Sequence, residues 1–191
     1  MPLSSVVGAQ SIVKPGVCTS STRPASPFEG QMIYETDTDK VLVYNGTAWK
    51  QVPTAATAGT VLQVVQGSTA TVTSTTTSTY IDSNLTATIT PSSSSSLVLV
   101  FVSQRTYASA ANVGIKLKLL RGSTQLTEAL EVNFNSAGSG SSLFNPIYQD
   151  SPATTSATTY KTQFALGSGT GTVYTQPSGN LGTITLMEIA G

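Results

Sequence analysis

Short runs in which apolar and polar residues alternate recur after residue 60, and this period of two constrains the fold more than any other feature. In residues 85–90, LTATIT, every second residue is apolar and the others are threonine. Residues 113–120, VGIKLKLL, and 160–166, YKTQFAL, repeat the pattern. Successive side chains of a strand point to opposite faces, so each run predicts a strand with one buried face and one solvent-facing face. We therefore predict an all-β chain that forms an antiparallel β-sandwich.

The same alternation predicts which residues form the core of that sandwich. Glu128 and Thr162 are the polar exceptions on apolar faces. The apolar residues predicted to point inward are Leu85, Ala87, Ile89, Val113, Ile115, Leu117, Leu119, Leu126, Leu130, Val132, Phe134, Tyr160, Phe164 and Leu166.

The run LVLVFV, residues 97–102, departs from the alternation because it is apolar at every position. Leu97, Leu99 and Phe101 fall on one face of the predicted strand, and the three valines fall on the other. A strand of this kind needs cover on both sides. Two interpretations remain open: a central strand flanked by a second layer, or a strand whose outer face meets another subunit.

The net charge of the chain and the length of its apolar runs argue against nucleic acid and membrane as partners. The chain has 191 residues, nine basic and nine acidic residues, and a formal net charge of zero. A basic surface that would bind phosphates is therefore absent from the composition, and we expect no nucleic-acid partner. The longest clear apolar run, residues 97–102, has the length of a strand, so we also expect no membrane insertion.

The residue types that carry most enzyme chemistry are scarce. The chain has no His and a single Cys, Cys18, which removes the commonest general base and the thiolate metal sites. Glu35, Asp37 and Asp39 lack the glycine and the distal Glu of a calcium loop. Glu128 and Glu131 fall on opposite faces of one predicted strand, so they cannot act as a glycosidase pair. We predict a protein that is not an enzyme, with no catalytic site, no metal site and no cofactor.

Composition shifts divide the chain into four parts. Residues 1–22 are polar and aperiodic and predict an extended N-terminal arm. Residues 23–52 predict a small β-meander, with strands at 32–35, 40–44 and 48–52 and a tight turn at Asn45-Gly46. Residues 53–59, PTAATAG, are a linker of small residues. Residues 60–191 form the sandwich.

The meander is too small to bury its apolar residues alone, because three short strands cover little surface. Its side chains must therefore pack on the sandwich, on copies of the module, or on a larger particle. The residues predicted to form this assembly or anchoring interface are Met32, Tyr34, Leu42, Tyr44 and Trp49.

Several stretches resemble known proteins. Residues 23–50, RPASPFEGQMIYETDTDKVLVYNGTAWK, resemble a segment common in tail fibres and other virion structural proteins of bacteriophages, especially marine and cyanobacterial ones. GTVLQVVQG at residues 59–67, residues 79–104, and TITLMEIAG at residues 183–191 resemble a domain that often follows it. The resemblance implies a homotrimeric virion appendage or capsid-decoration protein with a jelly-roll-like sandwich, no cofactor and no chemistry. Its partners would be itself and other capsid or tail proteins, in a virion assembled in the host cytoplasm.

The chain departs from long fibres because no shaft repeat or coiled coil follows the meander. This favours a short fibre, a knob, a cement protein or an adaptor whose N-terminal part anchors to the particle and whose sandwich forms a trimeric cap or projection. The alternative function is a host-surface carbohydrate-binding module. It would bind glycans through loops rich in Asn, Ser and Tyr, such as Tyr148–Thr155, because exposed aromatic rings stack on sugars.

Overall fold

The computed structural model describes residues 15–53, 56–133 and 138–191, without the side chains of residues 129–133. The chain divides into two compact units, Met1–Ala55 and Ala56–Gly191. Both units are built from β-strands, which confirms the predicted fold class.

The smaller unit is a four-stranded sheet in the order β1-β2-β3-β4. β2 (Met32–Glu35), β3 (Lys40–Tyr44) and β4 (Trp49–Gln51) form the antiparallel meander expected from the sequence. β1 (Gly16–Cys18) pairs with β2 in parallel, although the sequence assigns these residues to the arm. Three residues are too few to show a periodicity, so only the distant pairing reveals this strand. Residues 1–14 of the predicted arm lie outside the described residues.

The connection between β3 and β4 is a longer turn than the Asn-Gly dipeptide predicts. Tyr44 pairs with Trp49, which leaves Asn45 to Ala48 as the loop. The Asn45 side-chain oxygen accepts hydrogen bonds from the backbone N–H groups of Thr47 at 3.1 Å and Ala48 at 2.9 Å. Gly46 adopts a φ of 87°, the left-handed region that glycine tolerates. The Asn side chain thus closes the loop in place of a two-residue turn.

Within residues 56–133 and 138–191, the larger unit carries eleven strands and one short 3₁₀ turn. These elements are β5 (Val61–Thr69), β6 (Thr73–Thr75), β7 (Ile81–Ile89), β8 (Leu97–Ala108), β9 (Gly114–Arg121), β10 (Thr124–Asn133), β11 (Gly140–Phe144), β12 (Ile147–Asp150), β13 (Thr158–Ser168), β14 (Val173–Thr175), η1 (Pro177–Gly179) and β15 (Gly182–Ile189).

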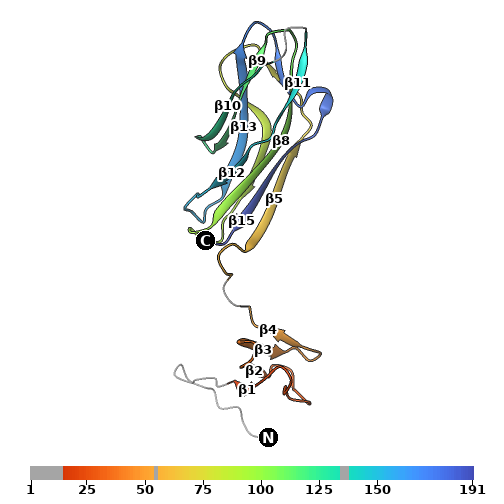
Figure 1. Cartoon of the computed structure of the whole chain (residues 1–191), viewed down its shortest axis with the longest axis vertical. Helices are drawn as coiled ribbons and strands as arrows, with labels where there is room; N and C mark the ends of the chain where they lie inside the picture. The colour runs from red at the N-terminus through yellow and green to blue at the C-terminus, as the bar shows by residue number, and fades with distance from the viewer. Residues whose placement is uncertain (1–14, 54–55, 134–137) are drawn as a thin grey trace. The chain divides into compact units, whose positions relative to one another are not determined.

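These strands form two antiparallel sheets that face each other (Figure 1). One has the order β10-β9-β13-β7, and the other runs β5-β15-β8. β8 is long enough to pair with four strands: β15 and β12 on opposite edges of its first half, and β14 and β11 on opposite edges of its second half.

The strand order is that of a jelly roll. Counting β5, β7, β8, β9, β10, β12, β13 and β15 as strands one to eight, one sheet reads 1-8-3-6 and the other reads 2-7-4-5. This arrangement of two facing four-stranded sheets is the double-sheet jelly roll. The prediction of a jelly-roll-like sandwich is therefore confirmed.

The core lies between the two sheets and follows the predicted alternation. Most of the predicted inward residues are buried in one cluster, together with Val98, Val100 and Val102 of β8 and Ile184 and Leu186 of β15. Leu126 and Leu166 are half-buried and pack against this cluster. The side chains of Leu130 and Val132, and all of Phe134, lie outside the described residues.

Thr162, the polar exception in β13, is fully buried. Its hydroxyl donates to the side-chain oxygen of Gln104 at 2.8 Å and lies 2.5 Å from the Ser83 hydroxyl. A buried hydroxyl is tolerated when it is hydrogen-bonded, so the two sheets are joined here by a polar chain as well as by apolar packing.

Candidate functional site: apolar faces of the two units

The first half of β8 presents an apolar row on the outer face of its sheet. Val98, Val100 and Val102 point into the core, whereas Leu97, Leu99 and Phe101 point outward and are half-buried. Strand β8 is thus a central strand, as one of the two interpretations of residues 97–102 predicts. Only one of its faces meets the second sheet, so within residues 56–133 and 138–191 the outer face is left without a covering layer.

Neighbouring strands extend this row into a patch. Leu99 pairs with Met187 of β15, and Met187 pairs with Val64 of β5. Val64 is 56% exposed, and Ile147 of β12, which pairs with Phe101, is 68% exposed. We call the patch the apolar outer face, and its residues are Val64, Leu97, Leu99, Phe101, Ile147, Met187 and Ile189.

A buried carboxylate fixes the strands beneath one end of this face. Glu188 of β15 is fully buried. It accepts hydrogen bonds from the Ser92 backbone N–H at 2.7 Å, the Ser92 hydroxyl at 2.6 Å, the Ser96 hydroxyl at 2.7 Å and the Gln63 side-chain amide at 2.6 Å. Burial alone would raise the pKa of Glu188, but the hydrogen bonds from Ser92, Gln63 and Ser96 outweigh it and hold the pKa at about 2.

In the smaller unit, one face of the sheet is closed around an ion pair. Ile33 and Leu42 are 1% and 5% exposed, and Glu35 on the same face is fully buried. Arg23, from the segment between β1 and β2, forms an ion pair with Glu35, and the Thr38 hydroxyl donates to the same carboxylate at 2.7 Å. The hydrogen bond from Arg23 is the largest cause that lowers the pKa of Glu35.

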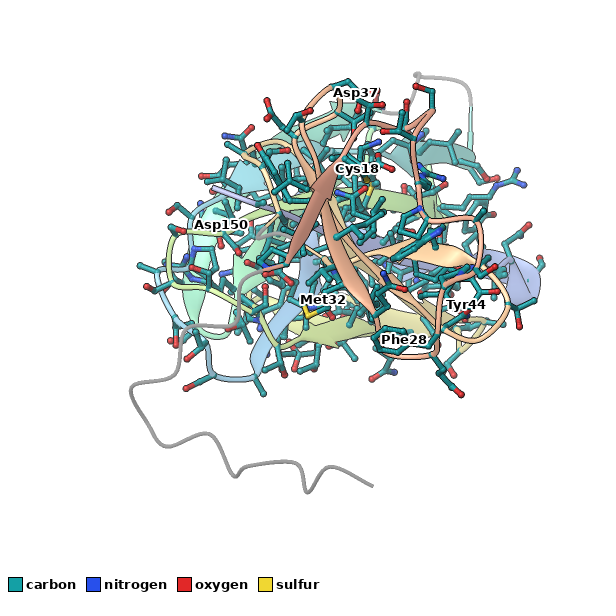
Figure 2. All side chains as sticks on the ribbon, turned by 90° about the horizontal axis from the view of Figure 1, so that it is seen from below. Cys18, Phe28, Met32, Asp37, Tyr44 and Asp150 are labelled. Atoms are coloured by element: carbon teal, nitrogen blue, oxygen red, sulfur yellow. The ribbon has the colours of Figure 1, made fainter. Side chains whose placement is uncertain are left out.

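The opposite face of the smaller unit is open and apolar. Val17 is 64% exposed and Met32 is 38% exposed, and Tyr34, Val41 and Val43 beside them are half-buried. Figure 2 shows Met32, Phe28 and Tyr44 toward one end of the module, with Cys18 and Asp37 toward the other end. We call the open apolar face the module face, and its residues are Val17, Met32, Tyr34, Val41 and Val43.

The structure separates the five residues predicted to anchor the protein. Met32 and Tyr34 lie on the module face. Leu42 belongs to the closed face and is buried within the unit, so its contribution is to the fold of the module. The rings of Tyr44 and Trp49 pack against each other with centroids 5.4 Å apart. Val17 was missed because β1 gives no sequence signal.

Asp37 and Asp39 of the smaller unit are bound to different partners. Asp37 accepts hydrogen bonds from the Ser20 backbone N–H at 2.9 Å and the Ser20 hydroxyl at 2.5 Å, and Asp39 accepts one from the Tyr34 hydroxyl at 2.5 Å. Across the described parts of the chain, no three His, Cys, Asp or Glu side chains are grouped as metal ligands would be. A search of the same residues finds no helix with the length and apolar character to cross a membrane.

The loop predicted for glycan binding is built differently from the expectation. Tyr148 is half-buried and packs against the hydrophobic core. The neighbouring Asp150 is buried and accepts hydrogen bonds from Arg121 at 2.8 Å and from the Tyr160 hydroxyl at 2.7 Å. Tyr148 and Asp150 therefore contribute to the fold, and glycan binding by the loop at residues 148–155 stays a prediction.

Comparison with known proteins gives structural neighbours only. No protein-family model and no curated protein sequence matches the chain. The structure of infectious bursal disease virus Gx strain is 11% identical with a TM-score of 0.41 and is matched over 78% of this chain and 40% of that one. The structure of the Gt strain is 10% identical with a TM-score of 0.41, and the match covers 79% of this chain and 44% of that one. A mutant VP2 protein of the same virus, in derived T=1 particles, is 13% identical with a TM-score of 0.38. The match covers 87% of this chain and 44% of that one. The chain thus spans less than half the length of each neighbour.

Proposed function

We propose that this protein is a non-enzymatic structural component of a bacteriophage virion that assembles through the apolar outer face of its sandwich. The observation that carries the proposal is the continuous apolar patch across β5, β15, β8 and β12. Large contiguous apolar patches on a protein surface mark interaction sites, because water contact with them is unfavourable. The resemblance of residues 23–50 to phage tail-fibre segments supports the class.

The form of the assembly is a homotrimer. Three copies meeting at the apolar outer face would cover Leu97, Leu99 and Phe101, the second side of the strand that is apolar at every position. The resemblance to phage fibre and decoration proteins implies this stoichiometry. The sandwich then acts as a cap or projection of a short fibre, knob, cement protein or adaptor, in a virion assembled in the host cytoplasm.

The smaller unit supplies the attachment to capsid or tail proteins. Its module face leaves Val17 and Met32 exposed beside two valines and a tyrosine, although the unit already closes its other face around Ile33 and Leu42. An apolar face that the unit does not use for its own core suits a neighbouring protein in the particle.

The native mass of the chain tests the assembly. We expect a trimer by light scattering for the full chain and for residues 56–191. Leu99→Lys places a charge in the middle of the apolar outer face and should give monomers. Ser103→Lys is the matched control, because Ser103 is exposed on the same strand outside the patch, and it should remain trimeric. Monomeric wild-type protein, or a trimeric Leu99→Lys variant, would contradict the proposal.

Attachment is tested separately on particles. Met32→Lys should reduce the amount of protein that copurifies with particles while leaving the mass of the sandwich assembly unchanged. Thr47→Lys, a change in the exposed β3–β4 loop, is the control with the same added charge. Equal occupancy of both variants and wild type would show that the module face is not the anchor.

A further inference from the structure

The outer face of β8 changes character after Phe101. The next outward residues are Ser103, Arg105 and Tyr107. Arg105 pairs with Leu143 of β11, and Tyr107 pairs with Ser141 of β11 on one side and Tyr174 of β14 on the other. The second half of β8 therefore presents Arg105 and Tyr107, whereas the outward residues of the first half are all apolar.

This region is hollowed. One depression of about 360 Å³ is lined by Arg105, Tyr107, Ser141, Pro177, Ser178 and Asn180. A second, of about 210 Å³, shares Arg105 and Ser141 with the first and is also lined by Ser142 and Leu143. We call the two together the arginine–tyrosine hollow. The volume of the larger one falls in the range of small-molecule sites.

Tyr107 gives the hollow an aromatic wall, and Tyr174 of β14 packs beside it. The rings of Tyr107 and Tyr174 lie with centroids 5.7 Å apart, tilted by 49°, and both residues are half-buried. Each ring thus limits the movement of the other while part of its surface stays accessible. A tyrosine with an apolar body and a polar tip suits a sugar, which offers C–H groups on one face and hydroxyls at its edge.

Arg105 supplies an available positive charge. The ion pairs among the described side chains are Arg23–Glu35, Arg121–Asp150 and Lys161–Asp82, and none involves Arg105. Its side chain is exposed at the point that both depressions share. A planar guanidinium binds a carboxylate through two parallel hydrogen bonds, so an anionic group on the ligand would find a specific partner here.

The rim of the hollow is a strained segment. β14 and β15 both pair with β8, and the chain between them leaves the sheet at η1. Gln176 and Ser178 adopt backbone φ values of 50° and 56°, which residues other than glycine rarely take. Gln176 is held by burial beside Gly182, where a Cβ would lie 2.8 Å from its amide nitrogen. Such strain persists where the surroundings enforce it, often at ligand sites.

We propose that the arginine–tyrosine hollow binds a carboxylated sugar, with the pyranose ring against Tyr107 and the carboxylate on Arg105. This function goes beyond self-assembly and uses the half of β8 that the apolar outer face does not. Ser141, Ser178 and Asn180 line the hollow and offer hydrogen-bonding groups to the sugar hydroxyls. Among the described residues, Arg105 is the one cation that lines the hollow, and the net charge of the chain is zero, so the hollow fits one carboxylate better than a row of phosphates.

Two glycosides that differ only in the acid group test the proposal on the full chain. Methyl β-D-glucuronide carries a carboxylate where methyl β-D-glucoside carries a hydroxymethyl group. In a ¹H–¹⁵N NMR titration, we expect the glucuronide to shift the amides of Arg105, Tyr107 and Tyr174 and to bind about tenfold more tightly than the glucoside, as a charge-assisted pair would give. Inorganic sulfate, titrated alone, should bind more weakly than the glucuronide.

Single substitutions distinguish the contribution of the Arg105 charge to binding from that of the aromatic wall. Arg105→Gln should abolish the preference for the glucuronide, and Tyr107→Leu should weaken the binding of both glycosides. Lys116→Gln, which removes a cation from β9 of the other sheet, should change neither. Equal binding of both glycosides, or a preference that survives Arg105→Gln, would overturn the carboxylate assignment. Sulfate binding as tight as the glucuronide, or no amide shifts at tens of millimolar glucuronide, would overturn the sugar site itself.

Discussion

Glu188 occupies a position that alternation reserves for an apolar residue. It follows Ile184 and Leu186 on the inward face of β15 and is as fully buried as they are. Charge in such a place is costly unless every lone pair finds a donor. Ser92, Ser96 and Gln63 supply those donors, so this carboxylate ties the β7–β8 loop and β5 to β15.

Replacing Glu188 by Gln should destabilise the sandwich by about 3 kcal/mol at pH 7, because the amide cannot accept from four donors as the carboxylate does. The folded pKa of about 2 lies below the ordinary 4.5. Ionised Glu188 therefore stabilises the fold fully above pH 4.5, and this stabilisation is lost as the pH falls toward 2. Urea unfolding at pH 7 and near pH 2 should show a large difference between wild type and variant at pH 7 and a small one in acid.

Asp82→Asn is the control for that experiment. Asp82 pairs with Lys161 on the surface at 2.9 Å, and exposed pairs contribute little. Its substitution should cost well under half of the Glu188 effect. A Glu188→Gln variant as stable as Asp82→Asn at pH 7 would show that the carboxylate does not tie the strands together.

Gly67 marks a close approach between β5 and β7. A Cβ at this position would lie 1.9 Å from the Thr86 carbonyl oxygen, and backbone cannot yield to it as a flexible side chain could. Gly67→Ala should destabilise the sandwich by about 3 kcal/mol, the cost of overpacking a fixed interior. Thermal unfolding measures the loss, and Ser68→Ala, at the exposed next position, should leave the midpoint nearly unchanged.

The sequence predicts the position of a residue where the local alternation of apolar and polar residues decides it. It does not predict the role of a residue that depends on partners distant in the sequence. The inward positions of β7, β9 and β13 follow from the period of two alone. Nothing near Glu188 in the sequence indicates that Ser92, almost a hundred positions earlier, will bind it. The arginine–tyrosine hollow was missed for the same reason, because β11, β8 and the chain after β14 meet only in the folded sheet.

At the scale of the element, β8 divides the outer face of its sheet into two surfaces. Its first half, with β15 and β12 on its edges, carries the apolar outer face, and its second half, with β14 and β11, carries the hollow. The sequence showed the first surface as an excess of apolar residues in 97–102. The jelly-roll order could not be derived from alternation, which predicts strands without choosing their neighbours.

The segment from β1 to β2 depends on one ion pair. Arg23 reaches Glu35, whose carboxylate is buried beneath that segment, and without the cation the charge would lose its largest stabilising contact. Arg23→Gln should speed hydrogen exchange severalfold at the amides of β1 and β2 and leave β8 and β15 unaffected. Lys50→Gln, an exposed change in β4, is the control, and equal exchange in both variants would contradict the assigned role.

At the scale of the whole molecule, the two units each close a core of their own. The smaller unit buries Ile33 and Leu42 around the Arg23–Glu35 pair, and the larger unit buries a cluster drawn from both sheets of the sandwich. The start of the larger unit is fixed within it, because the Gly59 backbone N–H donates to Ala190 at 2.8 Å and the Ala190 N–H donates to Thr60 at 2.8 Å. A chain beginning at residue 56 therefore retains every described element of the sandwich.

Residues 56–191 should consequently fold alone and unfold at the same temperature as the sandwich in the full chain, while the full chain should show a second, smaller transition at lower temperature. The smaller unit has few strands and a small buried core, so its stability is expected to be marginal. Calorimetry of both proteins at equal concentration, with the oligomer mass checked for each, measures the two transitions. Ile33→Ala, which removes a buried side chain from the smaller unit, should lower only the minor transition. A midpoint of the major transition that falls when residues 1–55 are removed, or that falls in Ile33→Ala, would show that the sandwich draws stability from the N-terminal unit and that the two do not fold as separate bodies.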